Sequence, residues 1–485
     1  MSIPFDNSYA RLSEAFYRHC APTPVAAPEL LIFNTALARE LGIPEDLDEA
    51  TLGQWFSGNA VPDGAEPLAM AYAGHQFGNF VPQLGDGRAL LLGEVIDSHG
   101  TRRDIQLKGA GRTPFSRGGD GRAPLGPVLR EYLVSEAMYA LGVPSTRALA
   151  AVLSGEPVMR EYPEPGAVLT RVASSHIRIG SFEFLAARGD RDNLHKLVDY
   201  VIQRHYPQAA DSANPALALL DAVIQAQANL VAHWMSVGFV HGVMNTDNMT
   251  VCGETIDYGP CAFLDTYHPQ TVFSSIDTGG RYAYRMQPAV AQWNLARLAE
   301  CLLALIDDDE QRAVQAATPL IHEFVPRYQA AWLTRFAAKI GIASPTPDDQ
   351  QLVEDLLALM ERDGVDFTLL FRTLADAIEN SALASHFFSD TDAWQNWAVR
   401  WHARLAEQSI ASAALRSSMR SVNPAVIPRN HRVEEALRLA REEQDVSLFR
   451  ALHARLSAPF DDCEGESLLP PPASGEQVCR TFCGT

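Results

Sequence analysis

The residues best suited to hold phosphate groups or a metal ion fall in four short segments. Residues 84–92 contain Gly-Asp-Gly-Arg and continue into an apolar run. Residues 105–122 begin as a predicted strand that presents Lys108 and continue as a loop rich in Gly, Arg and Asp. Further along the chain, residues 241–248 end in Asp-Asn, and residues 257–259 read Asp-Tyr-Gly. Glycine turns let backbone amides approach phosphate oxygens, and carboxylate and amide oxygens suit Mg²⁺ or Mn²⁺.

The order of these segments is typical of protein kinases, in which a glycine hairpin and a strand lysine hold the nucleotide. In kinases the catalytic aspartate lies five residues before the metal-binding asparagine. Counting back five residues from Asn248 reaches Val243, which cannot accept a proton. Because a positioned base contributes about 10²–10⁴-fold, we expect ordinary phosphoryl transfer to be badly impaired. Lys108, Asn248 and Asp257 are nevertheless present, so we expect a nucleotide and a divalent cation to bind.

Residues 127–141 predict a helix that is entered by a proline and ended by a glycine. In kinases a helix glutamate holds the nucleotide-binding lysine. We assign Glu136 as the partner of Lys108, because it lies on or beside the apolar face, where an unpaired carboxylate would be costly. Glu131 is the alternative partner.

Several site residues also have an ordinary structural explanation. Gly85 and Gly87 could form a plain hairpin turn, and Asp247 could cap its own loop. The dense polar loop of residues 112–122, which includes Asp120 and Gly121, could be an exposed flexible segment. Its place between the lysine strand and the glutamate helix favours a role in the site. Residues 241–248 correspond to the catalytic loop of kinases, and Asp247 is the carboxylate left in them. We therefore assign Asp247 as the candidate general base.

Three arginines lie in or near these segments. Arg88 follows the glycine turn and could offer a guanidinium fork to phosphate. Arg171 and Arg178 lie in a segment with no assignable counterpart in kinases. Additional arginines in a nucleotide site would serve to hold a triphosphate in an unusual orientation.

Composition limits the class of protein. With 485 residues, 47% hydrophobic and 20% charged, the chain can bury a large core and should divide into two or more lobes. A net charge of −20 makes a nucleic-acid polymer a poor candidate partner. No apolar run of 18 residues and no signal or transit pattern is found, so we expect no membrane span and a cytoplasmic protein.

The seven cysteines do not form a disulfide framework. Single cysteines at Cys20, Cys252, Cys261 and Cys301 are typical of small buried thiols. Cys479 and Cys483, in the last seven residues, form a Cys-x-x-x-Cys tail that is a plausible redox site.

The pattern along the chain predicts an α+β, two-lobed protein-kinase-like fold with an N-terminal extension and a helical C-terminal region. We expect an extension at 1–70, an N-lobe at 71–180, a helical C-lobe at 181–455 and a tail at 456–485. Helical spacing is found at 29–41, 215–237 and 289–306, and the chain beyond is mostly helical to about residue 455. Strands are expected in 80–125 and from 168, with a short hairpin at 249–252 and 254–256 that carries Asp257.

Taken together, the chain resembles the selenoprotein O family of protein adenylyltransferases, a pseudokinase-like group. The similarity extends over about residues 70–435, and residues 106–122 carry its most specific part. The other similar segments are 72–78, 83–89, 170–179, 241–248, 257–260, 292–298 and 423–434.

This resemblance implies that ATP binds inverted relative to kinases and that AMP passes to Ser, Thr or Tyr hydroxyls of proteins, with release of pyrophosphate. It also implies that Asn248 and Asp257 bind Mg²⁺ or Mn²⁺ and that Asp247 accepts the proton. The implied nucleotide contacts are Gly85, Gly87, Arg88, Lys108, Asp120, Gly121, Arg171 and Arg178.

Family members also end in a redox-active cysteine or selenocysteine that can pair with a cysteine near the activation loop. A bridge from Cys261 to Cys483 or Cys479 is therefore a hypothesis that rests on placement. Three alternative functions stay open: an inactive pseudokinase that uses ATP as a switch, a kinase that acts through Asp247, and transfer of UMP from UTP.

Overall fold

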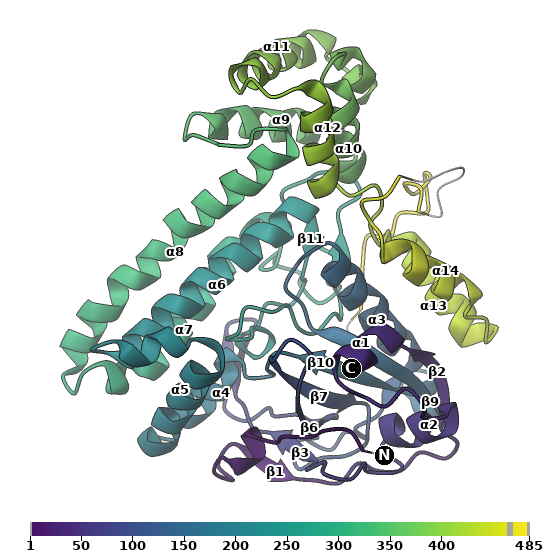
Figure 1. Cartoon of the computed structure of the whole chain (residues 1–485), viewed down its shortest axis with the longest axis vertical. Helices are drawn as coiled ribbons and strands as arrows, with labels where there is room; N and C mark the ends of the chain where they lie inside the picture. Colours follow the sequence, from purple (N-terminus) through teal and green to yellow (C-terminus); the bar gives the residue numbers. More distant parts are fainter. Residues whose placement is uncertain (1, 463–468, 483–485) are drawn as a thin grey trace.

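The computed structural model describes residues 2–462 and 469–482. Its centre is an antiparallel sheet of eight strands (Figure 1). The strands are β1 (Tyr17–His19), β2 (Glu29–Phe33), β3 (Leu68–Met70), β6 (Ala89–Ile96), β7 (Arg102–Lys108), β8 (Ala123–Pro124), β9 (Arg147–Met159) and β10 (Pro163–Ala173). Their order is β1-β3-β6-β7-β10-β9-β2, with β8 paired to β10. In this order β7, which carries Lys108, lies beside β10, which carries Arg171, and the register pairs Lys108 with Leu169.

Helix α3 (Leu125–Ala140) packs against β9 and β10. Its other side is covered by α13 (Asn430–Glu442) and α14 (Ser447–Leu456), which share a hydrophobic cluster with it. The expected helix at 127–141 is confirmed, with an earlier start. Because α3 is covered on both sides, each charged residue on it needs a partner inside the protein.

The N-terminal segment differs from the prediction. The expected helix at 29–41 is wrong in its first half, because Glu29–Phe33 is strand β2 and pairs with β9. Only α1 (Thr35–Glu40) is helical there, and it begins at Asn34, whose side chain accepts from the Leu37 amide. A short apolar run fits a strand as well as a helix, and pairing with a long neighbouring strand decides it. Helix α2 (Glu49–Ser57) follows, and β1 and β3 also join the sheet.

The helical part begins with α4 (Ile179–Ala186) and α5 (Arg191–His205). Three long helices then pack together: α6 (Pro215–Val237), α7 (Gln287–Ile306) and α8 (Glu310–Lys339). The helices expected at 215–237 and 289–306 are thus confirmed. Asn214 caps α6, and Gly238 ends it with φ 73°, a backbone conformation that favours glycine.

By length and composition, Pro215–Val237 and Tyr284–Ile306 are also apolar enough to cross a membrane. Of their apolar windows, 56% and 50% are buried inside the protein. Core helices of globular proteins pass the same test, so these two helices are weak evidence for a span.

Between α6 and α7 the chain is largely irregular. Strand β11 (Phe239–Val240) pairs with β12 (Ala262–Phe263), and one helical turn, η3 (Thr246–Asn248), lies between them. The hairpin expected at 249–256 is wrong. Thr250 bridges to Arg178, and Thr255 bridges to Ser145. The Thr250 hydroxyl donates to the Glu254 carbonyl at 2.6 Å, so a side chain closes this turn in place of a strand ladder.

The C-terminal helices form a second hydrophobic cluster at the top of Figure 1. They are α9 (Asp349–Asp363), α10 (Phe367–Ala377), α11 (Thr391–Glu407) and α12 (Ser412–Val422), which confirms the helical character expected there. Trp394, Trp397 and Trp401 stack along one face of α11 with ring centroids 5.2 and 5.3 Å apart. Short helical turns complete the chain at η1 (Tyr9–Arg11), η2 (Pro207–Asp211), η4 (Tyr284–Met286) and η5 (Ser381–Phe387).

Candidate functional site

Two cations and two carboxylates meet where the sheet, helix α3 and the loop before β12 come together. Lys108 Nζ lies 2.5 Å from Glu131 Oε2 and also donates to Asp257 Oδ1. Arg171 Nη1 lies 3.0 Å from Glu131 Oε1 and 3.8 Å from Asp257 Oδ1. Each carboxylate therefore faces both cations, and these four side chains form the ion cluster of the site.

This arrangement controls the charge of Asp257. Burial opposes its ionisation, but Lys108 and Arg171 outweigh that effect and hold the pKa of the carboxyl well below its usual range. Asp257 also has φ 71°, which is unusual for a residue with a side chain. Backbone strain of this kind persists where surrounding contacts enforce it, and it is common at functional sites.

The assignment of Glu136 as the partner of Lys108 is wrong. Glu136 accepts from Arg147 Nε at 2.8 Å and from the Ala148 amide at 2.9 Å. Glu131, the alternative, makes the contact with Lys108. The two glutamates are five positions apart along the helix. Their side chains therefore project about 140° apart around its axis and cannot both face β7. The apolar spacing did not discriminate between them, because α3 is buried on both sides.

The glycine turn is held against the loop of residues 112–122. A Cβ atom on Gly85 would lie 2.3 Å from Phe115 Cγ, and one on Gly87 would lie 3.0 Å from the Phe115 carbonyl oxygen. The Thr113 hydroxyl donates to the Asp86 carbonyl at 2.6 Å, and the Ser116 hydroxyl donates to the Gly87 carbonyl at 2.5 Å. These glycines are therefore required by the close approach of the protein's own loop, which fixes the turn.

Asp86, between the two glycines, was not predicted. Its carboxylate is buried and accepts from the Met70 amide and from Gln106 Nε2, each at 3.2 Å. Burial raises the pKa of this carboxyl, and Arg178 opposes the shift. A buried acid inside a turn had no distinguishing feature in the sequence except its two glycine neighbours.

A narrow pocket opens beside the ion cluster. It brings together Arg88, Lys108 and Asp257 of the predicted residues, while Asp120, Gly121, Arg171, Arg178 and Asp247 lie outside its lining. The lining residues are Arg88, Lys108, Ala123, Pro127, Val128, Glu131, Leu169, Asp257, Tyr258 and Gly259.

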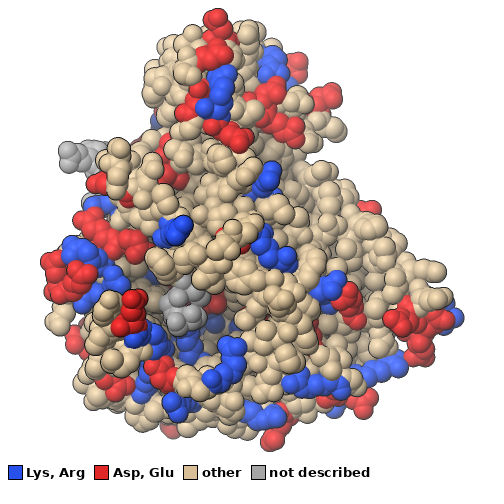
Figure 2. All heavy atoms as spheres, turned by 180° about the vertical axis from the view of Figure 1, so that it is seen from behind, with Lys and Arg blue, Asp and Glu red and all other residues tan. Residues whose placement is uncertain are grey.

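On the face drawn in Figure 2, Lys and Arg side chains border a hollow in the lower part of the molecule, despite the net charge of −20.

The loop that follows β7 holds two further predicted residues. Asp120 is exposed and pairs with Arg160 Nη1 at 2.8 Å, and this hydrogen bond lowers the pKa of the carboxyl. Gly121 has φ 71°, and a Cβ atom there would lie 2.0 Å from the Gly111 carbonyl oxygen. The loop therefore folds back on itself through glycine, and its role toward a nucleotide stays a prediction.

Arg178 connects the loop of residues 241–248 to the glycine turn. Its guanidinium is buried, lies 4.3 Å from the centre of the Tyr72 ring, and donates to the Asp247 carbonyl at 3.1 Å. Its Nη2 lies 3.9 Å from Asp86 Oδ1 and has no hydrogen-bond partner among the described residues. A buried guanidinium nitrogen of this kind can still bind an anionic oxygen.

Asp247 lies on η3 beneath a small hairpin of β4 (Gly74–Gln76) and β5 (Asn79–Val81). Its Oδ2 accepts from Gln76 Nε2 at 3.2 Å, while its buried Oδ1 has no hydrogen-bond partner among the described residues. A Cβ atom on Gly74 would lie 2.4 Å from that Oδ1. Burial raises the pKa of Asp247 to about 6. The hairpin is thus packed directly on the candidate base.

The residues proposed to bind metal supply oxygen atoms. Asn248 Nδ2 donates to the Val243 carbonyl at 3.1 Å, which leaves the amide oxygen as the atom that can face a cation. Together with the Asp257 carboxylate it fits Mg²⁺, which is commonly held by one or two protein groups plus substrate phosphates. Within the described part of the chain, no group of three or more His, Cys, Asp or Glu side chains is arranged so that it could hold a metal ion.

The C-terminal tail lies against the loop that carries Cys261. The Thr481 amide donates to the Phe273 carbonyl at 2.7 Å, and the Thr481 hydroxyl donates to the Pro260 carbonyl at 2.5 Å. Cys261 is buried, which raises the pKa of its thiol to about 12, and Cys479 is exposed. Both are free thiols, and Cys483 lies outside the described residues, so the bridge stays a prediction.

Comparison with known proteins gives consistent matches over the chain. The family model described as "Protein adenylyltransferase SelO" matches residues 1–457. A protein of Rhizobium rhizogenes named "Protein nucleotidyltransferase YdiU" is 58% identical over 487 residues, covering 100% of this chain and 97% of the relative. Proteins of the same name from Rhodopseudomonas palustris and Agrobacterium fabrum are 56% and 55% identical, covering 100% of this chain and 99% and 100% of the relatives.

The contact between Gly85 and Phe115 predicts a difference between two glycine substitutions. Gly85→Ala and Gly118→Ala both place a side chain at positive φ, but only position 85 also meets a ring, since nothing lies within 4 Å of a Cβ at Gly118. We expect Gly118→Ala to cost about 1–2 kcal/mol of unfolding free energy and Gly85→Ala about 1–3 kcal/mol more. Urea denaturation measures both, and equal losses would refute the close packing of the turn on its loop.

Proposed function

The chain belongs to the SelO family of protein adenylyltransferases, and from this premise we propose that it transfers AMP from ATP to Ser, Thr or Tyr hydroxyls of other proteins. The observation that carries the proposal is the intact cluster of Lys108, Glu131, Asp257 and Arg171 in a chain with Val243 at the position of the kinase base. Phosphate-binding charge is retained while the usual proton acceptor is missing. Such a site supports transfer of a different part of the nucleotide.

We propose a two-lobed, kinase-like arrangement for this chemistry. The N-lobe would be residues 71–180 and the helical C-lobe residues 181–455, with an extension at 1–70 and a tail at 456–485. Support comes from the pairing of a strand lysine with a helix glutamate, Lys108 with Glu131, and from the loop after α6 that carries Asp247 and Asn248.

The nucleotide would bind inverted relative to kinases, with its γ-phosphate inward and its α-phosphate toward Asp247. Lys108, Arg88 and Arg171 would neutralise the inner phosphates, and the buried Nη2 of Arg178 would donate to an oxygen nearer the catalytic loop. Amides of the turn at Gly85 and Gly87, and the loop at Asp120 and Gly121, would complete the contacts. Fixed donors of this kind stabilise the charge that develops during transfer.

Asn248 and Asp257 would hold Mg²⁺ or Mn²⁺. When bound, the cation neutralises phosphate charge and orients the nucleotide. Asp257 suits this role because Lys108 and Arg171 keep its carboxylate ionised. Its contact with Lys108 also fixes the carboxylate beside the pocket.

Asp247 would accept the proton of the target hydroxyl. The hydroxyl oxygen forms a bond to the α-phosphorus, the bond between that phosphorus and the bridging oxygen of the β-phosphate breaks, and pyrophosphate leaves. A carboxylate with a pKa of about 6 is a stronger base than an exposed aspartate and remains largely ionised near neutral pH. Gln76 holds one carboxylate oxygen, and Oδ1, which has no hydrogen-bond partner among the described residues, would take the proton if the hairpin over it gave way to the target hydroxyl.

A comparison of two labels tests the reaction. The chain would be incubated with Mg²⁺ or Mn²⁺ and with ATP labelled at either the α- or the γ-phosphate, and labelling of proteins would be measured. We expect label from α-labelled ATP alone and its loss in Asp257→Ala. Label from the γ-position would show a kinase acting through Asp247, and ATP binding with neither label would show a regulatory switch. A parallel arm with α-labelled UTP tests transfer of UMP.

The assignment of the lysine partner predicts that substitutions of two glutamates on α3 affect different properties, one AMP transfer and the other stability. Glu131→Gln should lower AMP transfer by about 10²-fold, because loss of the carboxylate displaces Lys108 and Arg171 from their positions. Glu136→Gln should lower the unfolding free energy by about 1–3 kcal/mol through its contacts with Arg147 and Ala148, with transfer nearly unchanged. Rates and urea midpoints would be measured for both variants, and a greater loss of transfer in Glu136→Gln would contradict the assignment.

A further inference from the structure

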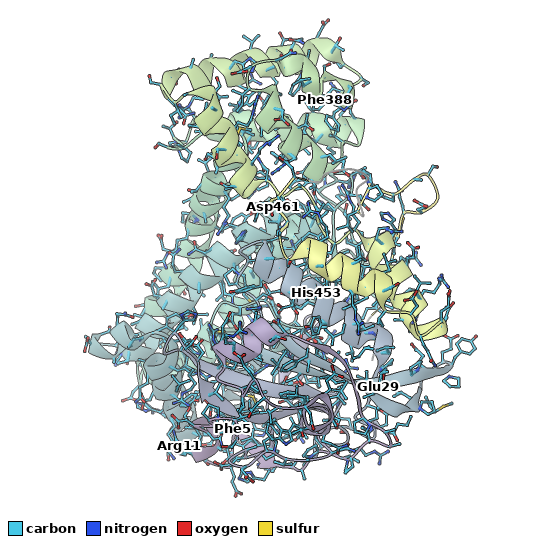
Figure 3. The ribbon with its side chains drawn as sticks, turned by 45° about the vertical axis from the view of Figure 1, so that its right-hand side comes forward. Phe5, Arg11, Glu29, Phe388, His453 and Asp461 are labelled. Atoms are coloured by element: carbon cyan, nitrogen blue, oxygen red, sulfur yellow. The ribbon has the colours of Figure 1, made fainter. Side chains whose placement is uncertain are left out.

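A second pocket, separate from the one beside the ion cluster, lies between α6 and α8. It has a volume of about 700 Å³ and is bordered by the end of α3, the end of α12 and the segment after α14. Figure 3 labels Asp461, which follows the lining residue Phe460, at the junction between the upper helices and the rest of the molecule. The site proposed above for the nucleotide shares no lining residue with it.

The charged groups of this pocket are all basic. Arg335 and Lys339 project from α8, and His233 faces them from α6. Among the described lining residues there is no Asp or Glu. Asp462, which follows Phe460 closely in the chain, is held by Arg372 at 2.5 Å and by Arg420 at 2.8 Å, so its carboxylate is already paired.

Lys339 is an unusual residue in this position. It is 2% exposed, and its Nζ lies 4.4 Å from the centre of the Phe371 ring and 5.3 Å from that of Phe367. No ion pair of Lys339 or Arg335 with a carboxylate is found within the described ranges. Cation–π contact offsets part of the cost of burial, but a buried ammonium without an anion is costly. Buried, strongly perturbed ionisable groups of this kind cluster at functional sites. An anionic ligand in the pocket would supply the missing charge.

The rest of the lining suits a small organic molecule. Ser236, Thr334, Ser421 and Asn229 offer hydroxyl and amide groups, and Leu141, Val237, Val422 and Phe460 offer apolar surface. Ligand pockets commonly combine an apolar wall with a few polar groups and have volumes of about 300–1,000 Å³. The pocket is therefore large enough for more than a single inorganic ion.

We propose that this pocket binds a small organic anion, whose phosphate or carboxylate group lies between Arg335 and Lys339 and whose body lies against the apolar wall. Arg335 would supply a guanidinium fork, and Lys339 a point charge. The inference rests on the pocket alone and stands whether or not the proposed transfer reaction is correct.

Binding would be measured by calorimetry on the full chain with 5′-AMP, pyrophosphate, inorganic phosphate and citrate, which separate phosphate from carboxylate and bare ions from organic ones. We expect 5′-AMP or citrate to bind saturably and more tightly than inorganic phosphate. Arg335→Gln and Lys339→Met should each weaken that binding at least about tenfold, since one charged hydrogen bond is worth about 1.5–3 kcal/mol. The matched control is Arg400→Gln on the exposed surface of α11, which should leave binding unchanged.

Two results of the binding measurement would overturn the proposal. One is that no probe binds saturably to the wild-type chain. The other is that binding is unaffected by Arg335→Gln and Lys339→Met, which would place the ligand at another site, such as the pocket beside Lys108.

A stability measurement keeps the proposal testable if a variant folds differently. Burial lowers the pKa of Lys339 to about 7, well below that of an unfolded lysine. Lys339 therefore lowers the unfolding free energy by its full amount below pH 7, and this loss shrinks as pH rises toward about 10. His233 and Arg335 are the other basic groups facing this pocket, and burial lowers the pKa of His233 to about 3. Without ligand, Lys339→Met should therefore raise the melting temperature more at pH 7 than at pH 9. A lowered melting temperature at pH 7 would show that Lys339 serves the fold and would contradict the proposal.

Discussion

The constraint on which the rest of the site depends is the mutual neutralisation of Lys108, Arg171, Glu131 and Asp257. The first three side chains are largely buried, while the Asp257 side chain is 33% exposed at the pocket. Removing any one of these charges leaves a partner without its counter-ion and free to leave its position. Strands β7 and β10 must be neighbours to present the two cations, and α3 must lie across them to present its glutamate. The loop that carries Asp257 is then held in a strained backbone conformation by the same contacts. The cluster therefore joins four separate segments of the chain at one point.

A second set of contacts joins the loop of residues 241–248, which carries Asp247, to the sheet. Arg178 donates to the backbone of Asp247 and lies over Tyr72, and the β4–β5 hairpin rests on the Asp247 carboxylate. The backbone approaches so closely that Gly74 leaves no room for a side chain. Burial under the hairpin raises the pKa of the carboxyl, and Arg178 and Gln76 partly oppose that shift. Position and basicity of Asp247 thus have a common structural cause, which is the packing of one small hairpin.

Much of the site was accessible from sequence, because its residues occur in short segments with recognisable chemistry. Lys108, Asp257 and the helix that supplies the glutamate were predicted, and they meet in the structure. The glutamate itself was assigned incorrectly, since a helix buried on both sides gives no apolar stripe that distinguishes Glu131 from Glu136. The strand at Glu29–Phe33 has helical spacing in sequence, and its strand conformation depends on pairing with β9, whose residues lie far along the chain. The pocket at Lys339 had no sequence pattern at all, because its lining is spread from Leu141 to Phe460.

The most direct test is a crystal structure of the chain with Mg²⁺ and a non-hydrolysable ATP analogue. We expect the inner phosphates to contact Lys108 and Arg171 and the α-phosphorus to be the phosphorus nearest Asp247. Asn248 and Asp257 would then face the cation. A γ-phosphate nearest Asp247, in the orientation that kinases use, would contradict it, as would a nucleotide bound away from the ion cluster.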